Sequence, residues 1–358
     1  MPVDTHYEAS KLEHQVFTQR AINFMADSEF GFRDAKGNYS PKKRVGYPPI
    51  FVWPLQPLNA IKWIFSIPGY FFPWNAFYVF LGLVCWFYLS PPLASFANPT
   101  LQLALLIFLR NSLLVVLFFG AFHYHLYLKR AQNSEFKFNA KWPMEKSKQF
   151  IFGNQNIDNI ILTFASGVTI WTIFELSILW IAAIGFVEVI SVRDSPIYFI
   201  LMIILIHLWR DLHFYIIHRL IHFQPLYAIA HRIHHKNTNP GPWSGLAMHP
   251  LEHVFYFSCA LVFLLFPFHP AFVIITLVHA GLSPAPGHSG FERIKTSDSK
   301  SFDTDSHAHY LHHKYFECNY ADGILPLDRW FGTFHDGSNE AHQHLRTRLK
   351  EKNLKKIN

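Results

Sequence analysis

Three groups of closely spaced histidines carry the most distinctive chemistry in this sequence. The first group has two histidines four residues apart, and each of the other two has histidines at positions i, i+3 and i+4. Side chains at these spacings lie on one face of a helix, so each group would present its imidazoles together. The eight residues are His218 and His222, then His231, His234 and His235, and finally His309, His312 and His313.

Eight clustered imidazoles indicate a metal site. One catalytic zinc ion takes three protein ligands and a structural one takes four, usually including cysteine. The three cysteines, Cys85, Cys259 and Cys318, are scattered and form no CxxC pair. Two metal ions, each with four or five imidazoles, fit the count better than one ion. Imidazole binds iron, zinc, copper and nickel alike, so the ligand set does not name the metal.

The elements that must position these histidines are membrane helices. The 358 residues are 51% hydrophobic and 15% charged, whereas a soluble domain has about 25% charged residues. Apolar runs at 74–90, within 101–128, at 157–192 and from Pro196 onward predict four membrane spans. The fourth span continues without a break into His218, so the first histidine group should lie where that span leaves the membrane.

Two further apolar runs, 254–266 and 270–282, are shorter and are separated by prolines. At about 1.5 Å per helical residue, each run covers roughly 20 Å, which is less than the ~30 Å hydrocarbon core. They predict a re-entrant helical hairpin, with two more full spans as the alternative. The expected fold class is therefore all-α: a polytopic membrane helical bundle of about four spans plus this hairpin, with a cytoplasmic histidine-rich helical cap.

The charge distribution sets the expected topology. The formal net charge is +7, and Lys and Arg concentrate in a few loops, including 42–44 and 129–148. By the positive-inside rule these loops face the cytoplasm, together with both termini and all the histidine groups. We interpret the charges as topology markers and lipid-headgroup contacts, not as a nucleic-acid surface. The polar N-terminus has no charged-then-apolar leader, so no cleaved signal peptide is expected.

The histidine groups resemble the histidine boxes of a known enzyme family. HRLIH at 218–222, HRIHH at 231–235 and HYLHH at 309–313 are similar to the HX3H, HX2HH and HX2HH boxes of the fatty acid hydroxylase/sterol desaturase superfamily. The accessory matches are Asp211, Tyr215 and Arg219 in a D-x3-Y-x2-H-R pattern, HPLE at 249–252, HSG at 288–290, and Asn319-Tyr320 with DRWFGT at 328–333. The resemblance covers about residues 155–336.

Members of this superfamily are integral-membrane non-haem di-iron enzymes that use O₂ and electrons to hydroxylate or desaturate lipids. The resemblance implies two iron ions, with zinc possible in a purified form, and it adds His249 and His288 to the clustered ligands. It also implies a membrane lipid substrate and a separate electron donor such as cytochrome b5 or a ferredoxin, because the chain has no HPGG haem segment and no nucleotide-binding glycine loop. The HPLE, HSG and C-terminal motifs look more like those of the sterol-modifying branch than those of the fatty-acyl 2-hydroxylase branch. The alkylglycerol monooxygenases share the same histidine boxes, and a sterol-type substrate is favoured over these other lipids.

Three further residues, Asp211, Tyr215 and Glu252, are expected to take part in the chemistry. Asp211 and Tyr215 share the helix face of His218. A carboxylate that accepts the second N–H of a metal-bound imidazole fixes the tautomer of that imidazole, and we expect this role for Asp211 and for Glu252. The alternative for both is a buried ion pair with a nearby arginine, namely Arg210, Arg219 or Arg232.

The spacing of the other histidines indicates which of them could join the metal site. His213 lies five residues before His218 and should point away from its face. His253 and His279 are open candidates, as ligands or as residues that support a ligand. The i, i+3, i+4 spacing favours His309 over His307 as the first ligand of its group.

Two charged residues, Arg110 and Glu175, fall inside the second and third expected spans. Charges inside a membrane are costly and are often functional. We favour a structural role, in which the two side chains pair with each other or Arg110 reaches toward the interface.

The resemblance also suggests a division of the chain. Residues 1–75 form a polar and interfacial segment, 76–155 the first two spans with a cytoplasmic loop, 156–336 a fatty acid hydroxylase-like catalytic domain, and 337–358 a polar tail. An amphipathic helix is expected around 12–25. The part from Tyr47 to Trp74, rich in Pro and aromatic residues, is expected to lie on the membrane, with a packed soluble cap as the alternative. The final Lys355-Lys356-Ile357-Asn358 resembles a dilysine retrieval signal, which favours the endoplasmic reticulum over a bacterial inner membrane.

Two rival functions are considered. A membrane zinc hydrolase would usually carry a glutamate base within its ligand motif, as in HExxH, and the chain has no such motif. A metal transporter would place ionisable ligands near the middle of its spans, whereas these histidines follow the spans. Both alternatives are therefore ranked below the oxygenase.

Overall fold

The structure is a computed structural model that describes residues 28–297 and 300–357. The amphipathic helix expected around 12–25 and the final Asn358 lie outside the described residues. The described part of the chain is largely helical, and its strands form two short antiparallel hairpins, β1 (Gly31–Arg33) with β2 (Tyr39–Pro41) and β3 (Arg293–Ser297) with β4 (Lys300–Asp303). The all-α fold class is confirmed.

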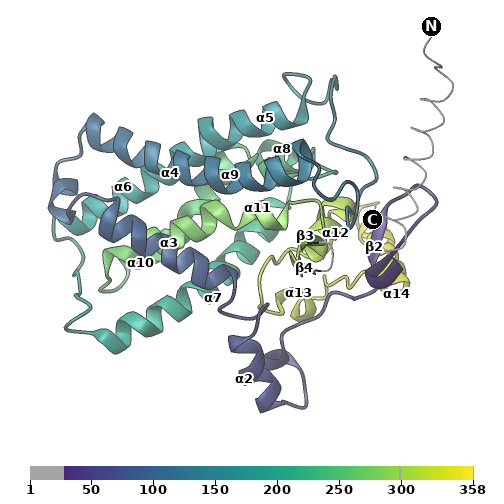
Figure 1. Ribbon diagram of the computed structural model, residues 1–358, viewed down its shortest axis with the longest axis horizontal. Helices are drawn as coiled ribbons and strands as arrows, with labels where there is room; N and C mark the ends of the chain where they lie inside the picture. Colours follow the sequence, from purple (N-terminus) through teal and green to yellow (C-terminus); the bar gives the residue numbers. More distant parts are fainter. Residues whose placement is uncertain (1–27, 298–299, 358) are drawn as a thin grey trace, which may run out of the picture.

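Figure 1 shows an elongated helical bundle with a smaller cap at one end. The bundle contains α3 (Trp74–Tyr88), α4 (Leu101–His123), α5 (Gln155–Leu162), α6 (Thr169–Ala183), α7 (Pro196–Ile221), α9 (Pro250–Phe257) and α10 (Pro270–Leu282). The capped end contains α8 (Arg232–His235), α11 (Pro284–Gly287), α12 (His307–Tyr315), α13 (Leu327–Trp330) and α14 (Asn339–Ile357). The amphipathic α2 (Pro57–Phe65) projects from the side of the bundle near α7.

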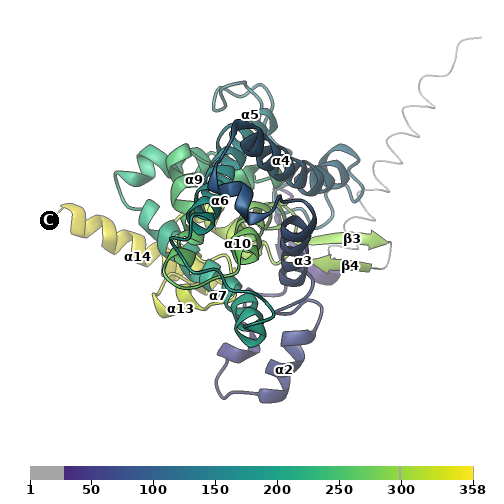
Figure 2. The same ribbon diagram turned by 90° about the vertical axis from the view of Figure 1, so that its left-hand side faces the viewer.

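Helix α10 forms the centre of the bundle, as the end-on view in Figure 2 shows. All of its residues are buried, because it is apolar on every face and is packed against α3, α6, α7 and α4. The helix begins with Pro270 at its first position, and the His269 ring accepts a hydrogen bond from the Ala271 N–H. Gly82 lets α3 approach closely, since a Cβ there would lie 2.6 Å from Ile275 Cγ1.

Within residues 28–297 and 300–357, four helical stretches are long and apolar enough to cross a membrane: Leu101–Leu128, Gln155–Ala183, Pro196–Ile221 and Pro270–Gly287. The number of spans agrees with the prediction, but their identity differs. The first expected span is α3, a helix of only 15 residues, and the stretch through α10 and α11 qualifies in its place. Helix α9, the following 3-10 segment Ser258–Leu264 and α10 do form a helical hairpin. That this hairpin is re-entrant remains a prediction.

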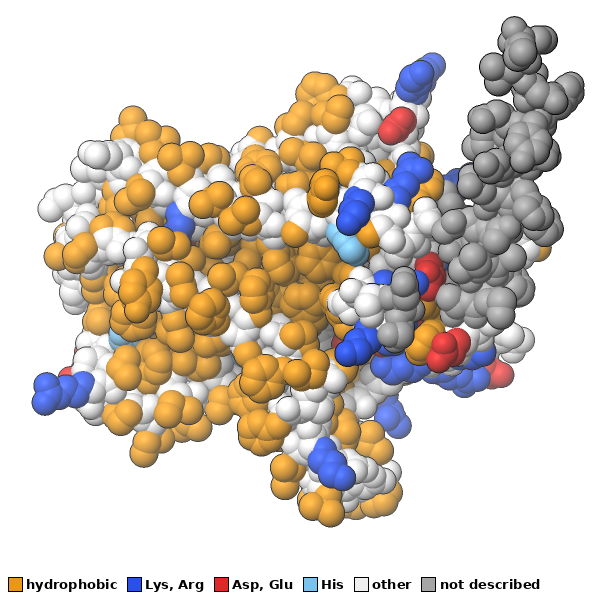
Figure 3. All heavy atoms as spheres, viewed as in Figure 1, with side chains coloured by type: hydrophobic (Ala, Val, Ile, Leu, Met, Phe, Trp, Pro, Cys, Tyr) orange, Lys and Arg blue, Asp and Glu red, His pale blue; other side chains and the backbone are white. Residues whose placement is uncertain are grey.

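The surface of the bundle matches a membrane setting. Figure 3 shows hydrophobic side chains covering the helices, while Lys, Arg, Asp and Glu gather mainly around the capped end. On α4 the exposed large hydrophobic residues are Leu101, Leu105, Leu106, Leu109, Leu113, Val116 and Leu117. An apolar surface this extensive would be a liability in water, so it indicates, together with the four apolar helical stretches, that the chain is a membrane protein.

The two intramembrane charges pair with each other. The Arg110 guanidinium on α4 lies 2.5 Å from the Glu175 carboxylate on α6, and both side chains are buried. Asn111, Thr172 and Ser90 complete the hydrogen-bond network around the pair. This arrangement agrees with the structural role expected from the sequence.

Candidate metal centre

The capped end of the bundle brings all three histidine groups together. His218 lies in the last turns of α7, and His222 is the C-cap of that helix. The second group lies on a π-helical turn (Tyr227–His231) that leads directly into α8. The third lies on α12, far away in the sequence. Each group keeps the shared helix face that its spacing predicts.

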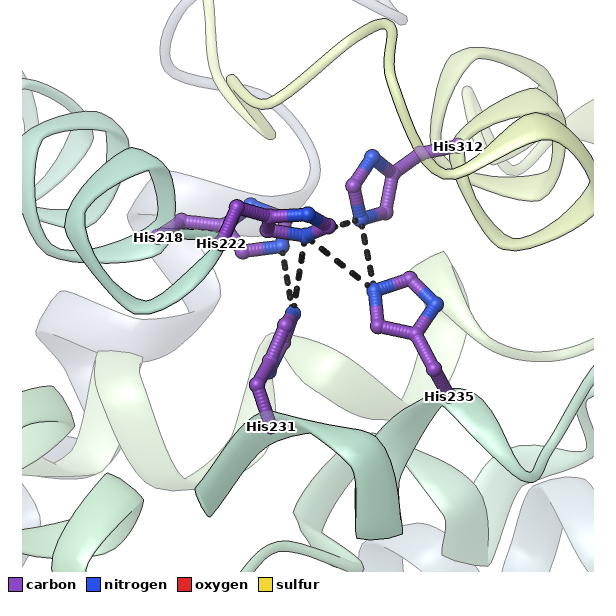
Figure 4. A group of neighbouring side chains, drawn as sticks. All are labelled: His218, His222, His231, His235 and His312. Atoms are coloured by element: carbon purple, nitrogen blue, oxygen red, sulfur yellow. Dashed lines mark hydrogen bonds between the residues drawn. The ribbon is translucent and has the colours of Figure 1, made fainter. Parts of the chain in front are cut away.

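The first cluster contains five imidazoles: His218, His222, His231, His235 and His312. Figure 4 shows that they point toward one another from three elements, α7, the segment through α8, and α12. Their Nε2 atoms are the nearest points, with separations of 3.0 Å for His231 and His222, 3.1 Å for His312 and His235, and 3.2 Å for the other neighbouring pairs.

The second cluster contains four imidazoles: His234, His288, His309 and His313. Here too the Nε2 atoms converge. His288 Nε2 lies 2.8 Å from His309 Nε2, 3.1 Å from His313 Nε2 and 3.3 Å from His234 Nε2. All four residues are buried. Sequence reasoning placed His288 in the ligand set through the HSG motif, and the structure places it at the centre of this cluster.

The nitrogen spacing fits metal coordination. A metal ion about 2.0–2.1 Å from each nitrogen separates neighbouring ligand nitrogens by about 3.0 Å in an octahedral arrangement and about 3.3 Å in a tetrahedral one. Neighbouring Nε2 atoms in the two clusters lie 2.8 to 3.3 Å apart, and all the donor atoms of each cluster lie within 4.8 Å of one another. Five donors around one point and four around another therefore match two separate ions.

The outer nitrogens of several rings are fixed by acceptors. The Nδ1–H groups of His218 and His312 donate to the carbonyls of Tyr320 and Cys318, each at 2.7 Å. That of His288 donates to the Pro284 carbonyl at 2.9 Å. Because a carbonyl only accepts, the proton lies on Nδ1, and in a neutral ring the Nε2 lone pair then points into the cluster.

A carboxylate holds a fourth ring in the same way. His231 Nδ1 lies 2.7 Å from Glu252 Oε1, and both side chains are buried. Glu252 thus occupies the position expected of it, next to the outer nitrogen of a candidate ligand. The glutamate comes from α9 and the histidine from the segment before α8, so the contact also ties these two elements together.

Burial keeps these histidines neutral. It lowers the pKa of His288 to about 4 and that of His222 further still. Burial, reinforced by the neighbouring imidazoles, also lowers the pKa well below 6.5 for His231, His234, His235, His309, His312 and His313. A neutral imidazole is the form that binds a metal, so the histidines of both clusters can bind metal ions at neutral pH.

One expected ligand lies elsewhere. His249 belongs to neither cluster. It is the N-cap of α9, where its Nδ1 accepts a hydrogen bond from the Leu251 N–H at 3.1 Å. Pro250 at the first helical position explains this geometry, since His-Pro here marks a helix start. We therefore remove His249 from the ligand set, which leaves nine histidines.

Asp211 does not hold a ligand imidazole, contrary to the expectation. Its Oδ2 accepts the backbone N–H of Ile324 at 2.9 Å. The carboxylate packs so closely on Gly323 that a Cβ there would lie 2.0 Å from Asp211 Cγ. Asp211 therefore anchors the loop after α12, and no ion pair with an arginine is formed within the described residues.

Tyr215 also lies away from the clusters. Its hydroxyl accepts a hydrogen bond from Arg219, and its ring stacks on Phe331 with 5.7 Å between centroids. It forms a small hydrophobic cluster with Tyr320 and Leu327. The structure thus gives Tyr215 a packing role beneath the loop that follows α12.

The remaining histidines have other partners. His213 Nε2 lies 3.0 Å from Ser258 Oγ, which confirms that it points away from the site. His253 contacts Ser166 Oγ at 2.8 Å and the Leu246 carbonyl at 3.2 Å, so both of its ring nitrogens are engaged. His279 pairs with His207 at 3.0 Å. Neither open candidate joins a metal cluster.

A cavity with an empty volume of about 410 Å³ adjoins the clusters. Its histidine walls are His218, His231, His234, His288 and His309, and its apolar walls are Phe214, Ile217, Ile221, Gly245, Met248 and Pro284. The remaining wall residues are Arg210, Glu252, Tyr256 and Asp322. A mostly apolar chamber thus opens directly onto both clusters.

Asp322 is a site residue that sequence reasoning missed. Its Oδ1 lies 3.9 Å from His309 Nδ1, and burial raises its pKa to about 6 although Arg210 opposes this. The Asp-Gly pair that follows the third histidine box was a turn signal, but nothing in the local pattern shows that the turn folds back onto the cavity.

Comparisons with known proteins agree with this geometry. The Fatty acid hydroxylase family model matches residues 203–333. A Delta(7)-sterol 5(6)-desaturase of Gibberella zeae is 34% identical over 142 residues, which are 36% of this chain and 40% of that protein. One from Aspergillus fumigatus is 28% identical over 155 residues (35% and 45%), and human lathosterol oxidase is 25% identical over 138 residues (36% and 44%). No solved structure matches significantly.

The matched stretch spans 40–45% of the length of these three relatives. The family-model match, residues 203–333, begins within α7 and ends after α13, so it includes every histidine of both clusters and the whole wall of the cavity. Residues 203–333 thus match the fatty acid hydroxylase family, and the relatives of the chain include sterol desaturases.

Proposed function

We propose that this chain is a membrane-bound oxygenase that hydroxylates or desaturates a C–H bond of a lipid, with a sterol-type substrate favoured. The observation that carries the proposal is the convergence of nine Nε2 atoms, in groups of five and four, on the wall of a mostly apolar cavity. The sterol preference rests on relatives that are named for sterol 5(6)-desaturation.

The metal is proposed to be iron, one ion in each cluster. Bound iron, reduced by an external donor, supplies the activation of O₂ that C–H oxidation requires. The chain itself supplies the neutral Nε2 ligands, and the Tyr320, Cys318 and Pro284 carbonyls hold the Nδ1 protons of three rings. Glu252 does the same for His231. A fixed outer partner orients the ring and raises its basicity.

The cavity is proposed to hold the lipid. Phe214, Ile217 and Ile221 on α7 give it an apolar wall beside His218. Such a wall excludes water and positions a hydrocarbon segment against the clusters. The electron donor is proposed to be a separate protein, such as cytochrome b5 or a ferredoxin. The proposed location is the endoplasmic reticulum with both termini cytoplasmic, and a bacterial inner membrane is the alternative.

Sterol and lipid analysis of cells that express the chain tests the proposal. Wild type should produce an oxidised or desaturated lipid that is absent with His312→Ala. The matched control is His249→Ala, which removes a histidine outside both clusters and should retain the product. An unchanged lipid profile in cells that express the wild type would argue against the oxygenase. An active enzyme that holds two zinc ions and consumes no O₂ would indicate a hydrolase instead.

A further inference from the structure

Arg210 places hydrogen-bond donors at the cavity that no residue in the described part of the chain accepts. The residue is 3% exposed and lines the cavity from α7. Its Nη2 donates to Tyr256 Oη at 2.7 Å and to Ser283 Oγ at 3.1 Å. A guanidinium has five N–H donors, and those on Nε and Nη1 have no hydrogen-bond partner among the described residues. No carboxylate lies within ion-pair distance of it in that part of the chain.

Asp322 places an unused acceptor at the same cavity. Its carboxylate accepts no hydrogen bond from any described residue, and its nearest ionic neighbour is His309 at 3.9 Å. By contrast, Glu252 is committed to His231 through Oε1, and its Oε2 is fully buried. Asp322 is therefore the available carboxylate of the cavity wall.

The loop that carries Asp322 is fastened on both sides. The Ile324 N–H donates to Asp211 at 2.9 Å, and the Ala321 N–H donates to Asp328 at 2.7 Å. The Tyr320 carbonyl, just before these residues, accepts from His218. Three contacts within five residues thus hold the carboxylate of Asp322 at the cavity.

We propose that Arg210 and Asp322 together bind a hydroxyl group of the lipid substrate. The hydroxyl oxygen accepts a hydrogen bond from the guanidinium, and the hydroxyl proton is donated to the carboxylate. The pair adds one available donor and one available acceptor to a cavity whose histidines belong to the clusters and whose other wall is apolar, which matches an apolar molecule with a single hydroxyl. This inference rests on the proposed function and adds the two residues that recognise the substrate.

The position of the pair also restricts the site of oxidation. Because Asp322 lies 3.9 Å from His309, the bound hydroxyl lies beside the second cluster. The oxidised carbon must then be only a few bonds from the carbon that bears the hydroxyl. In a sterol the hydroxyl is on C3, and C5 and C6 are two and three bonds away, which agrees with the 5(6)-desaturation named for the relatives.

Sterol binding without turnover tests the inference. Iron-loaded protein in detergent, kept anaerobic and without reductant, is titrated with cholest-7-en-3β-ol and with its 3-methyl ether, which keeps the acceptor but has no proton to donate. A hydrogen bond to a charged group corresponds to about tenfold or more in affinity, so wild type should bind the alcohol at least about tenfold more tightly than the ether. Asp322→Asn and Asp322→Ala should both lose most of this preference while retaining iron.

Asp336→Asn, which alters a carboxylate outside the cavity, is the matched control and should keep the wild-type preference. Equal binding of alcohol and ether by wild type overturns the inference, as does a full preference in both Asp322 variants. Turnover is measured separately with O₂ and reductant. A preference for the alcohol without any oxidised product would refute the proposed function and still support the hydroxyl-binding site. Equal oxidation of the alcohol and the ether would support the proposed function and refute the hydroxyl-binding site.

Discussion

Replacing Glu252 tests whether the outer partners of the histidines control metal binding. The structure joins Glu252 Oε1 to His231 Nδ1 at 2.7 Å, with both side chains buried. Loss of such a partner typically lowers metal affinity by about 10–100-fold, or about 1.4–2.8 kcal/mol. Glu252→Gln keeps an acceptor oxygen and should fall near the tenfold end. Glu252→Ala leaves a buried N–H without an acceptor and should approach about 100-fold.

The assay is a chelator competition on purified protein, with iron per chain measured at each chelator concentration. His253→Gln is the control, because His253 is the next residue of α9 and is bound by Ser166 and Leu246, outside both clusters. It should retain wild-type iron affinity even if it lowers thermal stability. Wild-type affinity in both Glu252 variants would refute the reasoning, and so would an equal loss in His253→Gln.

Three further predictions concern the clusters and the fold. His222→Ala and His313→Ala each remove a ligand from a different cluster, so each should lower the measured iron content by about one ion per chain while the other ion remains; complete loss of iron in either would show a single shared site. Glu175→Ala leaves the Arg110 charge buried and should cost about 3–5 kcal/mol of stability, whereas replacing both residues with Met should be nearly neutral in a thermal melt. Burial raises the pKa of Glu292 to about 7 from 4.5, so the folded state holds the proton of this carboxyl more tightly than the unfolded state does. The free energy of unfolding should therefore fall as the pH rises between these two values. Glu292→Gln should make the free energy of unfolding less dependent on pH in this range, and an unchanged dependence would contradict the role given to Glu292.

The sequence predicts the clusters well where the prediction depends only on the spacing of histidines along one helix. The i, i+3, i+4 spacing identifies histidines that share a helix face, and this geometry survives in α12, where His309, His312 and His313 all point inward. The same argument excludes His213, which contacts Ser258 instead. How the nine rings divide between two clusters could not be predicted, because neighbours such as His234 and His235 join different clusters.

The predictions that failed concern residues whose role depends on tertiary contacts. His249 was assigned through a motif, but a histidine before a proline at a helix start can cap the helix as well as bind a metal. Among the spans, α3 and α10 are both strongly apolar, and periodicity does not separate a central helix from one that faces lipid. Helix α10 is fully buried, which only the packing of its neighbours reveals.

The loop after α12 explains why the cavity was beyond sequence reasoning. In a few residues it supplies the Tyr320 carbonyl that orients His218, the Asp322 carboxylate at the cavity, and the Ile324 N–H that is bound by Asp211. The Tyr320 and Ile324 contacts join this loop to α7, and His218 lies 102 residues before Tyr320 in the sequence. The closure that completes the first cluster therefore also places the carboxylate at the cavity. Ligand orientation and the proposed recognition of the substrate hydroxyl thus depend on the same loop, and a change that loosens it should weaken both.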